Sequence, residues 1–333
     1  GEVHRHEIFF DKEEDTFTFP ADMEPLMIVV DEGFQIPKRL NFEKKTDELL
    51  YQLQNAPAPN DRIWAGRELS ETRSTKKIHT ALVDALESEP KWYVQRQIVN
   101  TYGSLKPRNG ERDLLAAYDG KDARVQRAIL SALREYDTDE VKEFLLNVME
   151  TEANDYLVSA ALSSLIKLDL EKAKEKFDWA MEQKSHGETI RNTALRILTE
   201  EKTDSNFAKL KELAVYGAAP YNIRGSIFSR LTQYREDHPE LLEFFADHIN
   251  DPHRWVRWTC ADQILRHGNA EQFADVLEMA DGEPLRGDRI ASIYEILDMR
   301  LAGLKKSKDR QEAKEVEKMQ KMFAKKADEW GSN

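Results

Sequence analysis

The sequence contains little of what many enzymes and secreted proteins depend on. Cys260 is the single cysteine among 333 residues, so an internal disulfide and any zinc or iron–sulfur site built from several cysteines are excluded. Because Cys260 lies within a regular helical pattern, we expect a buried structural thiol rather than a nucleophile. The longest uninterrupted apolar run, Leu26 to Val30, is far shorter than the roughly 20 residues that cross a bilayer, and we expect no membrane insertion.

Signals of compartment and of catalysis are also scarce. The opening residues GEVHRHEIFF lack the basic and apolar regions of a signal peptide, so the sequence leaves cytoplasm and periplasm open. Neither a glycine-rich phosphate loop nor a GxSxG elbow is present. The His6-Glu7 pair would need a second histidine at Phe10 to complete the zinc motif HExxH. His4 faces the same side as His6 without a third ligand, and we expect neither a metal nor a catalytic residue in this chain.

Charge of one sign is in excess. The chain has 49 Lys and Arg against 62 Asp and Glu, a net charge of −13. Nucleic acids and anionic membranes are therefore improbable partners, since both require a basic surface. One third of the residues are charged, above the usual quarter, which is typical of helical proteins with much surface and no single large core.

The first part of the chain has the alternation of β-strands. From residue 2 to about 43 apolar residues recur with a period of two, interrupted by turn-forming segments rich in Asp, Gly and Pro. This pattern predicts strands at Val3–Phe10, Thr16–Phe19, Leu26–Val30 and Ile36–Phe42. Four short strands make a small antiparallel sheet or half of a sandwich. Half a sandwich would leave an apolar face bare, which indicates a partner outside this chain.

After Glu43 the pattern becomes helical and repeats. A β-branched residue recurs at intervals of 31 to 34 residues. These anchor residues are Ile63, Val94, Val125, Val158, Ile190, Ile223, Val256 and Ile290. Two helices in each unit of about 32 residues indicate a helical-hairpin solenoid, and the recurring Asp, Val or Ile, then Arg is similar to short HEAT repeats.

The expected fold class is therefore mainly α: an α-α superhelix of HEAT-like repeats preceded by a small antiparallel β segment. The expected divisions are strands of a β-sandwich at 1–45, the solenoid at 46–304 and a C-terminal capping helix at 305–333. The last segment carries nine Lys or Arg against four Asp or Glu between residues 305 and 326. A polar outer face of this kind suits the terminal unit of a repeat array.

Charged residues of the repeat have two interpretations. Asp122 and Asp155 precede their anchors by three residues, as helix N-caps do. Arg191, Arg224 and Arg257 each follow an anchor by one residue. They form either a structural ladder with acidic neighbours along the stack, which we favour, or a row of anion-binding groups.

Aromatic and imidazole groups near the seventh repeat also allow two interpretations. Trp255 and Trp258, interleaved with arginines in HRWVRW, either pack between repeats, as we favour, or form an aromatic binding patch. His248, His253 and His267 match no zinc-ligand spacing. We interpret them as unrelated histidines.

One stretch resembles a known family. FTFP at 17–20, PLMIVVD at 25–31, LNFEK at 40–44, LLYQL at 49–53 and DRIWAGREL at 61–69 resemble the junction between the β-sandwich and the C-terminal helical domain of bacterial M1-family zinc aminopeptidases. The resemblance follows the whole chain in order and is sharpest from Phe17 to Glu71. The family's HExxH and GxMEN motifs, which hold the zinc and the substrate's amino terminus, are absent from this chain.

The resemblance implies a non-catalytic C-terminal domain that is inactive alone, encloses the active-site chamber and modulates peptide access. Its partners would be the upstream catalytic domain of the same polypeptide, which holds the zinc, and the peptide substrate. The expected peptide-facing residues are Tyr221, Arg224 and Arg257, with Arg pairing with a peptide carboxylate. The alternative is a free-standing HEAT-repeat scaffold that binds another protein. DNA binding, a third hypothesis, would need a basic groove despite the net charge.

Overall fold

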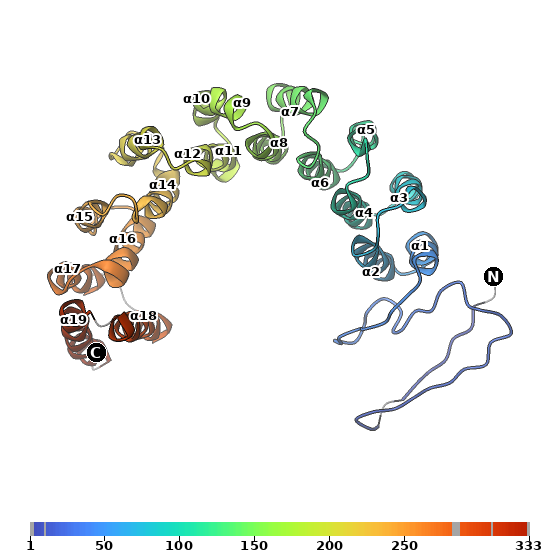
Figure 1. Cartoon of the computed structure of the whole chain (residues 1–333), viewed down its shortest axis with the longest axis horizontal. Coiled ribbons are helices and arrows are strands. Elements are labelled where there is room, and N and C mark those ends of the chain that lie inside the picture. Colours follow the sequence, from blue (N-terminus) through green and yellow to red (C-terminus); the bar gives the residue numbers. More distant parts are fainter. Residues whose placement is uncertain (1–2, 10, 282–286, 308, 332–333) are drawn as a thin grey trace. The chain divides into compact units, whose positions relative to one another are not determined.

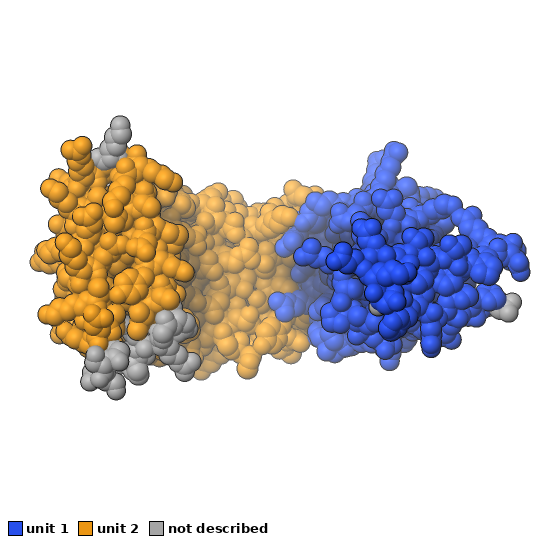
Figure 2. All heavy atoms as spheres, turned by 90° about the horizontal axis from the view of Figure 1, so that it is seen from below, with its two compact units in different colours: residues 1–136 blue, residues 137–333 orange. Residues whose placement is uncertain are grey.

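The computed structural model describes residues 3–9, 11–281, 287–307 and 309–331. The chain divides into two compact units, residues 1–136 and 137–333, which are coloured separately in Figure 2. From residue 46 onward the described residues form helices joined by loops. Among them, no helix combines the length and the apolar character that a membrane span requires.

Helices of the first unit alternate between two rows (Figure 1). The first row holds α1 (Thr46–Asn55), α3 (Lys76–Ser88) and α5 (Gly110–Ala116). The second row holds α2 (Pro59–Ser70), α4 (Trp92–Leu105) and α6 (Ala123–Leu133). Each first-row helix packs on the second-row helix that follows it, and α4 packs on both α2 and α6. The unit is thus a stack of helical hairpins.

The second unit repeats this arrangement. Its first row holds α7 (Asp139–Thr151), α9 (Leu170–Glu175), α10 (Phe177–Glu182), α13 (Asp204–Ala214), α15 (Leu241–Asp247) and α17 (Ala270–Asp281). Its second row holds α8 (Asp155–Leu168), α11 (Thr189–Ala194), α12 (Ile197–Glu200), α14 (Arg224–Leu231), α16 (Arg254–His267) and α18 (Gly287–Ser307). The 3-10 turns η1 (His186–Glu188), η2 (Tyr221–Ile223) and η3 (Thr232–Tyr234) flank second-row helices. The last helix, α19 (Arg310–Gly331), packs on α17 and α18.

Burial of the anchor residues stabilises the packing of the first-row helices on the second-row helices. Each anchor lies within the first five residues of a second-row helix or directly before it. Six of the eight, from Val94 to Val256, are at most 4% exposed, so a β-branched side chain is buried between the rows in every central repeat. The expected HEAT-like helical solenoid is confirmed.

Helix starts in the first row follow a simple rule. Thr75, Thr138 and Thr203 are the N-caps of α3, α7 and α13, and each side-chain hydroxyl accepts a hydrogen bond from the amide three residues on. A hydroxyl in this position satisfies one of the free amides of the first turn.

The expected second-row caps are half correct. Asp122 is the N-cap of α6 and accepts from the amide of Arg124. Asp155 is not a cap: Asn154 caps α8, and Asp155 is the first helical residue. The Asp155 carboxylate instead accepts the amide of His186 at 2.6 Å, at the start of η1. Asn154 and Asp155 are adjacent and both can cap a helix, so the period of the repeat could not show which of them is the N-cap.

The expected β segment is not observed. No strand occurs at 3–9 or 11–45, the described part of the predicted strand region, and residue 10 lies outside it. The amides of Ile28, Gly33 and Ile36 donate to the side chains of Glu48, Asp61 and Asp31 rather than to a neighbouring strand. Since strands are stabilised by paired backbone groups, the alternating sequence forms no ladder here.

Part of this segment is nevertheless fixed to the first helical hairpin. The amide of Gly33 lies 3.1 Å from the Asp61 carboxylate, and its carbonyl accepts from the Asn60 side chain at 2.8 Å. Gly33 has a φ of 83°, a left-handed conformation that glycine adopts without strain. Apolar side chains on either side stay exposed, with Leu26 at 61% and Ile36 at 65%. Residues 31–34 therefore form an anchored turn between exposed apolar stretches.

Candidate functional site

Arg224 is buried in an ion pair. It is 4% exposed, and its Nε lies 2.9 Å from Oδ2 of Asp251, which is 7% exposed. Its Nη1 donates to the carbonyl of Ala214, the last residue of α13. The guanidinium thus joins the C-terminus of one helix to an acidic residue of the next repeat.

Arg257 and Tyr221 contact the same loop. Nη1 of Arg257 donates to the carbonyls of Asp251 and Pro252 at 2.8 and 3.1 Å, and the Tyr221 hydroxyl donates to Pro252 at 3.2 Å. The structure therefore brings the three sequence-predicted residues together around residues 251–253, named here the Asp251 loop. Arg224 is buried, Arg257 is half-buried and Tyr221 is 51% exposed.

Of the three predicted ladder arginines, Arg224 pairs with an acidic residue of the next repeat, whereas Arg191 pairs with Glu188 in its own repeat. Arg62, which lies one residue before its anchor and was not predicted, forms a pair like that of Arg224. Arg62 pairs with Glu89 as Arg224 pairs with Asp251, and both pairs span 27 residues. Arg62 also donates to the carbonyl of Ala56, the C-cap of α1. Arg191 forms the same kind of contact with the last carbonyls of α10. These guanidiniums supply donors to helix C-termini, whose carbonyls lack partners within the helix.

The two tryptophans play different parts. Trp258 is 9% exposed and carries the Arg289 guanidinium 3.9 Å from its ring centre, whereas Trp255 is 68% exposed. Next to Trp255, the buried His253 ring lies 4.7 Å from the Tyr221 ring. Burial lowers the pKa of His253, which favours a neutral imidazole at pH 7. Tyr221 and Trp255 thus present exposed aromatic faces beside the Asp251 loop.

Histidine and cysteine side chains are the natural candidates for a metal or catalytic site. Within the part of the chain that the structure describes, no three His, Cys, Asp or Glu side chains come together as a group able to hold a metal ion. His6 stacks on Phe19 with ring centres 4.4 Å apart. Cys260 is fully buried, and burial raises the pKa of its thiol, which disfavours the reactive thiolate.

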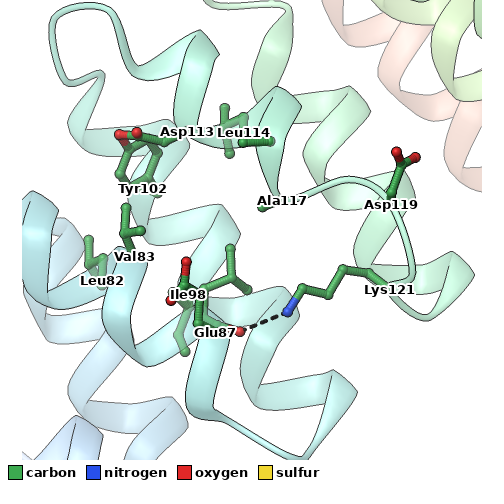
Figure 3. Close-up of a pocket in the computed structure, with 12 residues that line it drawn as sticks. Leu82, Val83, Glu87, Ile98, Tyr102, Asp113, Leu114, Ala117, Asp119 and Lys121 are labelled. Carbon is green, nitrogen blue, oxygen red and sulfur yellow. Dashed lines mark hydrogen bonds between the residues drawn. The ribbon is translucent and has the colours of Figure 1, made fainter.

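A cavity of about 350 Å³ in the first unit escaped sequence reasoning (Figure 3). It lies among α3, α4, the seven-residue α5 and the loop that follows α5. We call it the α3–α5 pocket. Its apolar lining includes Leu82, Val83, Ile98 and Leu114. The feature of the sequence that could have indicated it is the short stretch between Pro107 and Gly120, which leaves room for only a short helix.

Carboxylates dominate the polar lining of the α3–α5 pocket. Glu87, Asp113 and Asp119 line it together with Lys121, whose amine donates to the Leu86 carbonyl at 3.0 Å. The Tyr102 hydroxyl donates to Asp113. With three carboxylates against one ammonium, the pocket complements a group that has an apolar stem and a positive end.

Comparison with known protein families agrees with the helical-repeat architecture. The family of HEAT repeats matches residues 79–166, from α3 to α8. No curated protein sequence matches the chain. A crystal structure of Legionella pneumophila aminopeptidase A in complex with aspartic acid is similar over 83% of this chain, with 15% sequence identity and a TM-score of 0.44. The aligned region spans 39% of that aminopeptidase chain. The chain contains a HEAT-like helical repeat domain.

Proposed function

We propose that the chain is the non-catalytic helical region of an M1-family zinc aminopeptidase, where it encloses the active-site chamber and limits peptide access. The observation that carries this proposal is the resemblance of residues 17–71 to the family's sandwich-to-helix junction. Zinc would belong to the catalytic domain, because this chain has no HExxH motif. Its role is to shape access rather than to perform chemistry.

The anchored turn supports the proposal that this segment pairs with another domain. Gly33 is fixed to Asp61 of α2, yet residues on both sides expose apolar side chains and form no ladder. A segment of this composition acquires strand structure when a neighbouring sheet supplies backbone partners. The proposed catalytic half of the polypeptide would complete that sandwich.

Peptide contact would centre on Tyr221. Its half-exposed ring presents an aromatic face, while Arg224 and Arg257 hold the Asp251 loop against which it rests. Tyrosine offers a large contact area at a small cost in side-chain entropy. In this proposal Tyr221 binds peptide, and the two arginines act chiefly by positioning it.

Complementation tests the proposal directly. The fragment encoded upstream of Gly1, expressed separately, should co-elute with this chain and gain aminopeptidase activity toward peptides. In the whole enzyme, Tyr221→Ala should raise KM for long peptides more than for a dipeptide, because only long peptides reach the helical region. Tyr156→Ala, at another exposed tyrosine, is the matched control. Absence of association, or of HExxH upstream, would contradict the proposal.

A protein-binding scaffold is the second candidate, favoured by one observation. All residues lining the α3–α5 pocket fall within the 79–166 segment that matches HEAT repeats. In this alternative the pocket receives a lysine or arginine side chain of a separate protein, held by its apolar stem and by Glu87.

A photo-crosslinking amino acid in place of Val83 discriminates the two candidates. A crosslink to a basic side chain of a separate protein, lost in Glu87→Gln, would favour the scaffold. A crosslink confined to the catalytic domain of the same polypeptide would favour the aminopeptidase.

A further inference from the structure

A second cavity, of about 370 Å³, lies within the second unit. We call it the basic pocket because Lys202, Arg235 and His267 line it, together with the amide of Gln263. The three cationic residues follow or end the second-row helices of three successive repeats. Consecutive repeats thus contribute one cationic side chain each to a single cavity.

These three cationic side chains have no carboxylate partner in the described part of the chain. Among the described residues, Lys202, Arg235 and His267 form no ion pair within 4.0 Å. Two nearby arginines form ion pairs. Nε of Arg266 lies 2.9 Å from Oδ2 of Asp262, and Nη2 of Arg300 lies 2.8 Å from Oε1 of Glu312. One carboxylate, that of the exposed Glu236, is among the residues that line the basic pocket. In a chain with a net charge of −13, this cavity gathers three cationic residues against one carboxylate.

The pKa of His267 is lowered by its surroundings. Burial lowers it first, and the positive charges of Arg235, Arg300 and Arg266 lower it further, against a smaller opposing effect of Asp262. A neighbouring cation disfavours the imidazolium. An anion bound in the cavity would offset this repulsion and raise the pKa of His267.

Helix termini explain part of the arrangement but not all of it. Cations near helix C-termini interact favourably with the helix dipole, which accounts for basic residues at these ends. It does not account for a cavity between them or for Gln263, which is 8% exposed and lines the same space. The Gln263 amide nitrogen donates to Asp262 at 3.4 Å, and its second hydrogen can serve a polar occupant beside the unpaired cations.

We propose that the basic pocket binds the phosphate group of a small phosphomonoester. Two permanent cations and a histidine match a dianion, and guanidinium, ammonium and amide donors reach more oxygens than a planar carboxylate offers. The cavity volume exceeds that of inorganic phosphate alone, which leaves room for the organic part of an ester.

Calorimetry and NMR titration of the whole chain test this proposal. O-phosphoserine should bind, weaken as salt rises, and raise the pKa of His267 by about half a pH unit or more, a change within the ordinary spread of histidine pKa values in folded proteins. Inorganic phosphate should bind at least several-fold more weakly, and serine with acetate should leave the pKa unchanged. Equal binding of inorganic phosphate would overturn the assignment to an ester.

Variants separate the site from the fold. Arg235→Met and the exposed Lys202→Met should each weaken O-phosphoserine binding about tenfold, while Lys184→Met, an exposed lysine of the same unit that does not line the pocket, should not. Thermal unfolding checks that each variant is folded. Undiminished binding in both pocket variants, or an unchanged pKa of His267 with saturating ligand, would overturn the proposal. This outcome leaves the aminopeptidase proposal untouched.

Discussion

The Arg224 guanidinium and the Asp251 carboxylate form a buried ion pair across two repeats of the second unit, with Nε and Oδ2 2.9 Å apart. Asp251 also accepts the backbone amide of His253 at 2.8 Å. The same carboxylate therefore fixes both the arginine and the start of α16. This pair links the stacking of repeats to the loop beneath Tyr221.

Removing one member of this pair should be costly. In Arg224→Met, the Asp251 carboxylate stays buried without its counter-ion, and we expect a loss of about 3–5 kcal/mol in the free energy of unfolding. The double variant Arg224→Met/Asp251→Asn should lose less, because Asn keeps an acceptor for His253 and no charge is buried. Urea unfolding of Arg224→Met, Asp251→Asn and the double variant measures these losses, with Lys184→Met as the control. A double variant that loses as much as the summed single variants would refute this account.

Close approach of α14 and α16 predicts a contrast between two glycines. A Cβ added to Gly225 would lie 2.9 Å from Cβ of Trp255 and 3.1 Å from Cε1 of His253, whereas one added to Gly303 meets nothing within 4 Å. We expect Gly225→Ala to destabilise by about 1–3 kcal/mol through overpacking. Gly303→Ala, within α18, should stabilise by up to about 1 kcal/mol through helix propensity. Paired thermal unfolding curves check this contrast, and equal shifts would contradict it.

Asp61 predicts a pH dependence of the first unit. It is fully buried, and burial raises its pKa above the ordinary value of 3.8, although the Gly33 amide opposes the shift. The folded state therefore binds the Asp61 proton more tightly than the unfolded state does. The stability that Asp61 contributes is complete below pH about 4 and is lost as pH rises through its folded pKa.

Asp61→Asn isolates this effect, since Asn keeps an acceptor for Gly33 and does not titrate. The free energy of unfolding of the variant relative to the unchanged protein should improve as pH rises from about 4 to about 7. Amide hydrogen exchange at Gly33 should show whether the anchored turn persists. A difference that stays constant with pH would show that Asp61 has an unshifted pKa.

Cys260 should resist thiol reagents in the folded chain. Burial raises its pKa and shields the sulfur, so labelling by an aromatic disulfide at pH about 8 should proceed only as fast as the second unit opens. Urea should accelerate it to the rate of a free thiol. In a Cys260→Ala background, Arg266→Cys places a thiol on an exposed position of the same helix and should react at once. Equal rates for the two thiols would contradict a buried Cys260.

Patterns in the sequence predicted the helical repeats because the cause is local and recurrent. One β-branched residue per repeat is buried between two rows, and its interval of 31 to 34 residues is visible without coordinates. The cap at Asp122 followed from the same interval, while the cap at Asn154 was missed because two adjacent residues share that chemistry. The position of Arg224 was also recognisable, since an arginine follows three successive anchors by one residue.

The predicted strands are not found at 3–9 and 11–45, the described residues of that region, because the stability of a strand is not local. The alternation at residues 16–42 shows that the segment could form strands, but a strand also needs a neighbouring strand. The backbone amides of Ile28 and Gly33 instead donate to side chains of α1 and α2. Likewise, two tryptophans three residues apart looked equivalent until packing buried Trp258 and exposed Trp255.

Periodicity along the chain thus established the repeat unit, its anchors and its arginines. Tertiary structure alone decided that Arg224 meets Asp251, that residues of α3, α4 and α5 line the α3–α5 pocket, and that Lys202, Arg235 and His267 line one cavity. The physical reason is distance along the chain. A side chain's place within its own helix follows from nearby residues, but its partners come from repeats about 30 residues away, and only the packing of helices brings them together.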